Sequence, residues 1–121
     1  MNKIMQYVEE KIEPILRHGE KIGRMMLFLV YNKDCTAYDY AYVYDFEIYY
    51  EGNRHKGYGT HALLETVYQY GRVYVFPSNP NSEKLYARLG KQITIEDCPD
   101  ALKTAYKECG TGYLISIGGK E

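Results

Sequence analysis

The sequence predicts a mixed α/β or α+β fold, and three observations support this. Segments with helical spacing of apolar residues alternate with β-branched and aromatic segments, in the order helix, strands, helix, strand, helix, strands. Tyrosine is the second signal: the chain has 15 copies and no tryptophan, and tyrosine suits half-buried pleated surfaces. The third is the length of 121 residues, from which we expect residues 1–121 to form a single domain.

The first third of the chain predicts a helix and a strand. Residues 2–17 carry apolar side chains at spacings of three and four, which indicates an amphipathic helix that Pro14 kinks or ends early. The segment His18-Gly19-Glu20 is interpreted as the helix stop. Residues 24–31 then predict a buried strand, closed by a turn at 32–34.

A long strand is predicted over residues 38–50, and its length leads us to expect a bulge or a break. Alternate residues of a strand share one face. One face would be aromatic and is expected to be core: Tyr38, Tyr40, Tyr42, Tyr44, Phe46, Ile48 and Tyr50. The opposite face is mixed and carries Asp45 and Glu47 near its middle.

The second half of the chain predicts shorter elements separated by glycines and prolines. After Gly57-Tyr58-Gly59, helical spacing of apolar residues begins. The predicted elements are a helix over 60–70 ended by Gly71, a strand over 72–76, a loop over 77–81, a helix over 82–89 ended by Gly90, a strand near 92–95, a helical turn after Pro99 and a strand over 113–117.

Composition argues against several classes of protein. The net charge is -1 and the basic residues are scattered, so we expect no nucleic-acid partner. No apolar run approaches the ~20 residues of a membrane span, and the N-terminus has no apolar signal segment, so we expect a cytoplasmic protein with no membrane partner. Cys35, Cys98 and Cys109 form no Cys-x-x-Cys pair. We therefore expect reduced thiols and no metal site.

The segment Gly57-Tyr58-Gly59 lies between a predicted strand and a predicted helix, an arrangement that suits phosphate binding. A Walker A loop would need Lys and Ser or Thr directly after Gly57, where Tyr58 and Gly59 stand. A dinucleotide fingerprint is matched by Gly57, Gly59 and Ala62, but the acidic residue expected about 20 positions later is missing, and the chain is short for a full dinucleotide domain.

A third interpretation includes Arg54, which gives Arg-x-x-Gly-x-Gly over residues 54–59. A second motif follows at a suitable distance: Asn79, Ser82, Leu85-Tyr86 and Leu89-Gly90. Together the two motifs resemble the GNAT superfamily of N-acetyltransferases, over roughly residues 42–90. The resemblance implies a central, twisted, mostly antiparallel sheet flanked by helices that binds acyl-coenzyme A. The N-terminal half looks too short for the family's usual pair of helices.

The resemblance also implies how the coenzyme is held, with acetyl-coenzyme A as co-substrate and no metal. The residues expected to bind it are Ile48, Tyr49, Arg54, His55, Lys56, Gly57, Tyr58, Gly59, Thr60, Asn79 and Ser82. Backbone N–H groups of 56–60 and basic side chains would bind phosphates. The strand edge at 48–49 would pair with the pantetheine arm, and Asn79 would bond to it from the other side. Tyr58 would face the core or flank the nucleotide.

Acetyl transfer to an amine requires a group that removes a proton, because a typical amine with a pKa of about 10 is mostly protonated at neutral pH. Glu47 is our first candidate for this base and Asp45 the second, the alternative being that both are solvated or paired with basic residues. Tyr86 matches the family's tyrosine that protonates the departing sulfur, the alternative being a core tyrosine. His18 and His61 are expected in capping or surface roles.

The expected function is therefore N-acetyl transfer from acetyl-coenzyme A to a primary amine, on a small molecule or a protein, by a monomer or homodimer. Two alternatives remain. One is a catalytically silent coenzyme-binding or protein-interaction module on the same scaffold. The other is an unrelated tyrosine-rich binding protein with a chance glycine loop.

Overall fold

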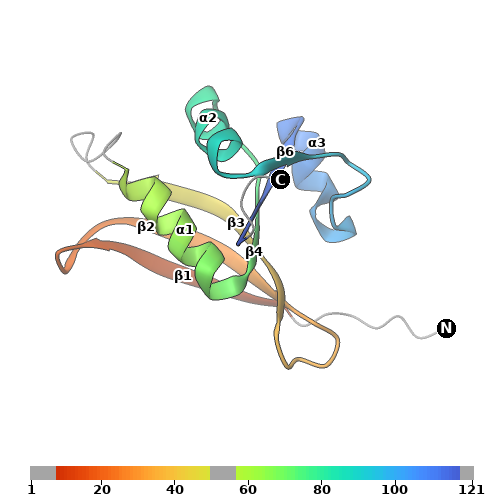
Figure 1. The fold of residues 1–121 in the computed structure, drawn as a ribbon, viewed down its shortest axis with the longest axis horizontal. Coiled ribbons are helices and arrows are strands. Elements are labelled where there is room, and N and C mark those ends of the chain that lie inside the picture. Colours follow the sequence, from red (N-terminus) through yellow and green to blue (C-terminus); the bar gives the residue numbers. More distant parts are fainter. Residues whose placement is uncertain (1–7, 50–56, 118–121) are drawn as a thin grey trace.

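The computed structural model describes residues 8–49 and 57–117. The strands within these residues form a six-stranded sheet in the order β1-β2-β3-β4-β6-β5 (Figure 1). Neighbouring strands run antiparallel except β3 and β4, which are parallel. The predicted mixed α/β class and the expected mostly antiparallel sheet are therefore confirmed.

The elements follow one another with few long connections. Their bounds are β1 (Val8–Arg17), β2 (Glu20–Tyr31), β3 (Tyr38–Ile48), α1 (Tyr58–Tyr70), β4 (Arg72–Val75), α2 (Pro80–Leu89), β5 (Lys91–Ile93), the 3₁₀ helix η2 (Asp100–Leu102), α3 (Lys103–Cys109) and β6 (Gly112–Ser116). The predicted helix ends at Gly71 and Gly90 are confirmed, since each glycine N–H donates to a carbonyl of the last helical turn.

The predicted N-terminal helix is wrong over the described residues, because Val8–Arg17 is the edge strand β1, paired with β2 over its whole length. Val8, Ile12 and Leu16 are four residues apart, a spacing that fits one face of a helix and equally one face of a strand. The segment interpreted as a helix stop is a tight hairpin: His18 and Gly19 both have positive φ, at 50° and 80°. Two such residues between paired strands are typical of a type I′ turn.

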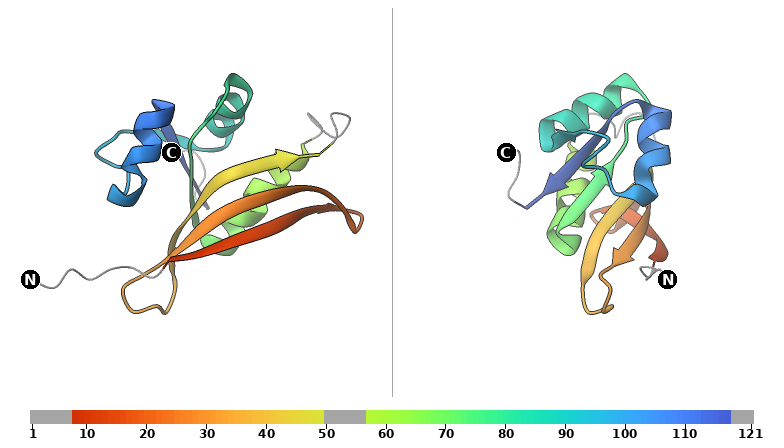
Figure 2. Two further views of the ribbon diagram at one scale, coloured as in Figure 1. Left: turned by 180° about the vertical axis from the view of Figure 1, so that it is seen from behind. Right: turned by 90° about the vertical axis from the view of Figure 1, so that its right-hand side faces the viewer.

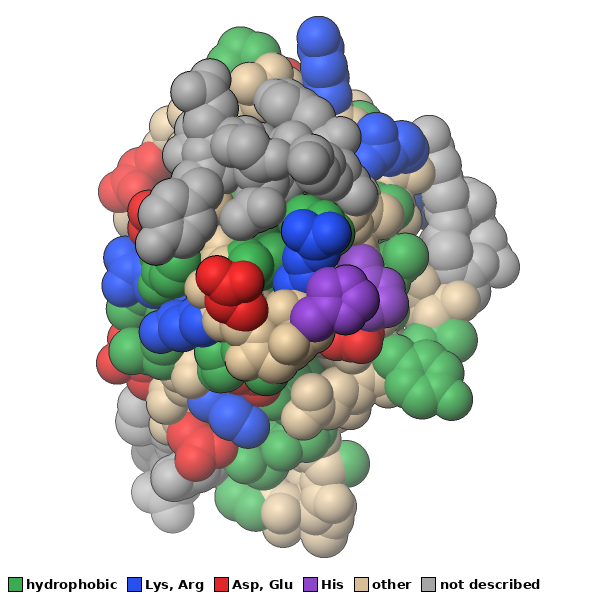
Figure 3. Space-filling model, turned by 90° about the vertical axis from the view of Figure 1, so that its left-hand side faces the viewer, with side chains coloured by type: hydrophobic (Ala, Val, Ile, Leu, Met, Phe, Trp, Pro, Cys, Tyr) green, Lys and Arg blue, Asp and Glu red, His purple; other side chains and the backbone are tan. Residues whose placement is uncertain are grey.

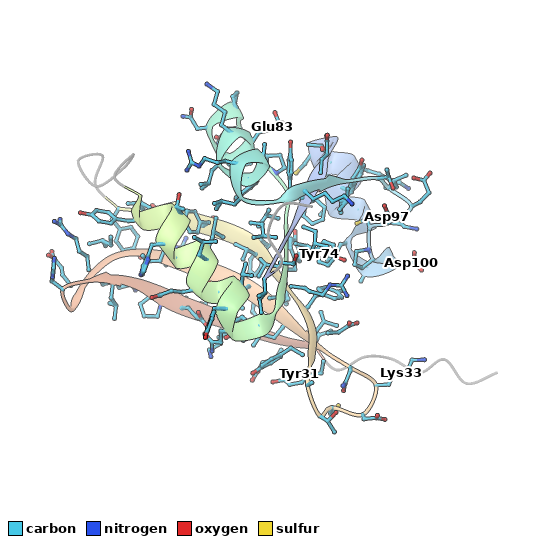
Figure 4. The ribbon with its side chains drawn as sticks, in the orientation of Figure 1. Tyr31, Lys33, Tyr74, Glu83, Asp97 and Asp100 are labelled. Carbon is cyan, nitrogen blue, oxygen red and sulfur yellow. The ribbon has the colours of Figure 1, made fainter. Side chains whose placement is uncertain are left out.

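Helices cover the two faces of the sheet unequally (Figure 2). On one face, here called the α1 face, α1 and α2 pack over a core that includes Leu27, Leu63 and Val73. On the other, the α3 face, η2 and α3 cover a smaller core that includes Tyr40, Tyr74 and Leu102. Tyr74 lies near the centre of the molecule, with its ring 5.2 Å from that of Tyr40 (Figure 4).

Strand β3 has the expected bulge, which changes the assignment of its faces. Met26 pairs with Asp45 and Leu27 with Val43, so Tyr44 is the extra residue. The prediction of one aromatic core face is wrong, because helices cover both faces near Tyr40–Val43 and the bulge brings Phe46 to the α1 face beside Val43. A bulge exchanges the faces of the residues that follow it.

Candidate functional site

Strands β3 and β4 separate at their carboxyl ends. They pair only from Ala41–Val73 to Val43–Val75. Strand β3 then continues to Ile48, whereas β4 ends and the chain turns toward α2 (Figure 1). We call the region where Tyr44–Ile48 diverges from the end of β4 the wedge. Ligands of sheets with parallel strands bind outside the carboxyl ends of those strands, so the wedge is the first place to look for a site.

Helix α1 begins beside the wedge with an open N-terminus. Its N-cap is Gly57, which adopts a left-handed conformation with φ of 83° and supplies no side-chain cap. His61 N donates to Gly57 O at 3.0 Å, whereas the N–H groups of the first turn have no acceptor inside a helix. Gly59 packs closely, since a Cβ atom there would lie 3.0 Å from the Phe46 ring. Among the described residues, no side chain caps the first turn of α1.

Two arginines from other elements flank this first turn. Arg88 of α2 donates to Thr60 Oγ1 at 3.0 Å, and the Arg17 guanidinium lies 4.9 Å from the Tyr58 ring centroid. Figure 3 shows this end of the molecule, where basic side chains and histidines lie next to the residues drawn in grey. Positive charge near a helix N-terminus favours an anionic ligand. Sequence reasoning missed both arginines, because only the packing of α2 and of the hairpin brings them here.

The predicted basic residues Arg54, His55 and Lys56 lie outside the described residues. Of the predicted loop, the structure describes Gly57, Tyr58, Gly59 and Thr60, and all four belong to the cap and first turn of α1. The Tyr58 ring packs against the Arg17 guanidinium.

Asn79 and Ser82 form the start of α2 rather than an open polar pair. Asn79 Oδ1 accepts from Ser82 N at 2.9 Å, and Ser82 Oγ accepts from Asn79 N at 3.2 Å, which completes a capping box. Ser82 Oγ also donates to Asn79 O at 2.9 Å. Both side chains therefore have structural partners, and of the two the Asn79 amide nitrogen is the less committed, with one long contact of 3.5 Å to Ser78.

Ile48 and Tyr49 use one edge of their strand for β2. Ile48 pairs with Gly23, and Tyr49 N donates to Ile22 O at 2.7 Å. The opposite edge of this segment borders the wedge, because the described ladder between β3 and β4 has already ended at Val43.

Tyr86 projects from α2 into the protein and is 6% exposed. Burial, followed by the charges of Cys109 and Asp45, raises the pKa of its hydroxyl to about 12. Cys109 belongs to α3, and Asp45 lies on the α3 face of β3, whereas α2 packs on the α1 face. The Tyr86 hydroxyl therefore interacts with groups from the opposite side of the sheet, and it stays protonated throughout the neutral range.

The predicted carboxylates share one cation. Arg24 Nη2 lies 3.3 Å from Asp45 Oδ2, and Arg24 Nε lies 3.6 Å from Glu47 Oε2. The charge of Asp45 is one cause of the raised pKa of Tyr86, whereas Glu47 is not among the causes.

The histidines lie where surface roles were expected. His18 forms the β1–β2 turn, and His61 pairs with Glu65 at 3.0 Å on the exposed side of α1. Within the described residues, no cluster of His, Cys, Asp and Glu has the arrangement of a metal site. Residues 8–49 and 57–117 also contain no helix long and apolar enough to cross a membrane.

Comparison with protein-family models, curated proteins and solved structures finds no match to this chain. The site must therefore be interpreted from its own geometry.

Proposed function

We propose that this chain is an acetyltransferase domain of GNAT type, which binds acetyl-coenzyme A in the wedge and transfers the acetyl group to a primary amine. One observation carries the proposal: the N-terminus of α1, which packs against Phe46, and Asp45, whose charge raises the pKa of Tyr86, both lie beyond the point where β3 stops pairing with β4. The two sequence motifs support it, because the first leads into α1 and the second coincides with α2.

The wedge matches the parts of the coenzyme in order. The pyrophosphate binds at the first turn of α1, where backbone N–H groups and Arg88 supply donors. The pantetheine arm follows β3 beyond Val43 toward the bulge, with its amides pairing to the strand as an added strand would. The thioester then reaches the region between Asp45 and Tyr86.

Transfer follows from these positions. Asp45, directly or through a water molecule, removes a proton from the ammonium group, and the amine nitrogen attacks the thioester carbonyl carbon. A backbone N–H at the Tyr44 bulge stabilises the oxyanion, since a bulge leaves a residue without a ladder partner. The C–S bond breaks as the C–N bond is kept, and Tyr86 donates its proton to the departing thiolate. The attached nitrogen then still carries one proton more than the amide product, and it releases this proton to water. Solvent returns a proton to Tyr86 and accepts the one held by Asp45, so one proton is released overall.

A second function has a specific observation in its favour. Both carboxylates are paired with Arg24, so neither is free to accept a proton until that contact is exchanged. A silent coenzyme-binding module would keep the wedge and the open helix start but would not turn over. The two functions share the coenzyme and differ only in transfer.

The deciding experiment is a titration of the purified protein with acetyl-coenzyme A, followed by calorimetry and by thermal melting. We expect saturable binding, with stabilisation of about 2.7 kcal/mol at a hundred times the dissociation constant. NADH at the same concentration is the control and is expected to leave the melting temperature unchanged. If acetyl-coenzyme A gave neither heat nor a shift at millimolar concentration, the enzyme and the silent module would both be excluded, and the tyrosine-rich binding protein would remain.

A further inference from the structure

We propose that the acceptor is a lysine side chain in a protein segment, and that this segment docks on the part of the α3 face formed by β1, β2 and β3. This inference rests on the proposed function and adds the substrate class and the surface that selects it. We call this surface the open face; its residues are Val8, Glu10, Ile12, Arg24, Met26, Phe28, Tyr44, Asp45 and Glu47.

No described helix covers the open face, because β1 and β2 are joined by a two-residue turn and α3 lies over the other end of the sheet (Figure 2). Apolar side chains are exposed there: Val8 is 50% and Ile12 57% exposed. The Phe28 ring stacks on that of Tyr44, with centroids 4.7 Å apart. A contiguous apolar and aromatic surface of this kind marks an interaction site.

The open face leads directly to the proposed catalytic group. Ile12 pairs with Met26, and Met26 pairs with Asp45, so the three lie in one row across the strands. Asp45 is in turn one of the charges that reach Tyr86. A side chain extending from a segment bound along this row would point its terminal amine toward the wedge.

The charges of the open face favour a basic segment. Glu10, Asp45 and Glu47 contribute three carboxylates, and Arg24 contacts Asp45 and Glu47. The other basic residues of β1 and β2 have partners outside the open face: Lys11 contacts Glu13, Arg17 lies over the Tyr58 ring and Lys21 over the Tyr49 ring. Glu10 accepts a hydrogen bond from the Tyr44 hydroxyl, which places its carboxylate beside the aromatic rings. Aromatic rings next to carboxylates attract the ammonium group and cover the methylene stem of lysine.

The shape of the open face favours a protein over a small amine. Small ligands are held in concave sites that bury most of their surface. The concave site of about 530 Å³ lies on the opposite face, between β1 and α1, and is lined by residues such as Ile15, Thr66 and Gln69. An extended sheet surface with exposed apolar side chains instead matches a polypeptide.

The test compares two acceptors. One is a set of short peptides of mixed sequence with a central lysine, and the other is Nα-acetyl-lysine amide, which has the same free ε-amine without flanking residues. Ile12→Lys and Met26→Lys place a positive charge on the open face. Tyr68→Lys is the matched control, because Tyr68 is 84% exposed on α1. We expect the first two to raise KM for peptides about 10-fold or more, while the small amine, the affinity for acetyl-coenzyme A and the Tyr68→Lys protein are unchanged.

Equal peptide kinetics in all variants would overturn the proposal, as would a native enzyme that uses Nα-acetyl-lysine amide as efficiently as the peptides. If the native protein bound acetyl-coenzyme A but transferred to no peptide, the acceptor assignment would be wrong while coenzyme binding stood. A native dimer that Ile12→Lys dissociates without changing transfer would show that a second copy covers the face. Loss of acetyl-coenzyme A binding in the native protein would instead overturn the proposed function itself.

Discussion

The starts of α1 and α2 lie at the ends of two neighbouring parallel strands, yet they are built in opposite ways. Helix α2 is closed: Asn79 and Ser82 form a capping box, Pro80 occupies the first turn and Glu83 supplies an acidic residue there. Helix α1 is open, with Gly57 as cap, no side-chain cap and no acid in its first turn. The comparison shows that α2 satisfies its first amides with its own side chains, whereas α1 has no such cap among the described residues.

Closing α1 should have the largest effect. Gly59→Asp places a carboxylate in the first turn, where it occupies the free amides and repels phosphate. We expect acetyl-coenzyme A binding to fall below detection in calorimetry, with the melting temperature lowered only by the displaced Phe46 ring. Gly59→Ala introduces the same Cβ without the charge and is expected to retain measurable binding. Unchanged affinity in Gly59→Asp would place the phosphates elsewhere.

The second effect concerns the middle of α2. Tyr86→Phe keeps the ring and removes the hydroxyl, so kcat should fall by about 10² to 10⁴ while the affinity for acetyl-coenzyme A stays within a few fold. Assays of acetyl transfer measure kcat, a coenzyme titration measures the affinity, and a thermal melt measures stability. If Tyr86 served only the core, turnover per folded molecule would be intact and only stability would change, by about 1 kcal/mol for a lost hydrogen bond.

A smaller effect is expected at Arg88, which extends from α2 to the start of α1. Arg88→Gln removes one charge-assisted contact to phosphate and should weaken acetyl-coenzyme A binding about 10-fold, with a shallower dependence on salt. Lys84→Gln removes the same charge from an exposed position one turn earlier on this helix and is the control. The assignment of Arg88 would not survive equal affinities in the two variants.

The smallest effect tests the closed start of α2. Asn79→Ala removes the cap and should lower the free energy of unfolding by about 1 kcal/mol, which denaturant unfolding measures. Affinity for acetyl-coenzyme A should remain within a few fold, since the Asn79 side-chain oxygen Oδ1 already accepts a hydrogen bond from Ser82 N. An affinity loss well beyond the stability loss would show that the Asn79 amide also binds the coenzyme, and the contrast between the two helix starts would weaken.

Elements with local signals were predictable from the sequence. Gly71 and Gly90 end their helices through local backbone geometry, which does not depend on tertiary packing. The predicted strand before Pro77 and the predicted helix after it lie close to the observed bounds of β4 and α2. Strand β1 was missed because its apolar spacing fits two periods, and only pairing with β2 decides between them. The bulge was expected from strand length, but its position at Tyr44 depends on the register with β2.

The candidate site was predictable in its residue types and less so in its contacts. The motifs located the start of α1, which packs against Phe46 of the wedge, and α2 with Tyr86. The pairing of Asp45 and Glu47 with one arginine, and the approach of Arg88 to Thr60, are contacts between distant segments that carry no local signal. The structural role of Asn79 and Ser82 was present in their spacing, since a polar residue followed three positions later by another is typical of a capping box.

Pro14 has a consequence for how this protein behaves in concentrated solution. It lies in β1, at the edge of the six described strands, where a strand from another molecule could otherwise extend the sheet. Proline offers no N–H to an incoming strand, and the charged neighbours Lys11 and Glu13 add a further barrier. Growth of the sheet from this edge is thereby opposed, so the molecule can leave an apolar surface uncovered beside it with less risk of aggregating strand by strand.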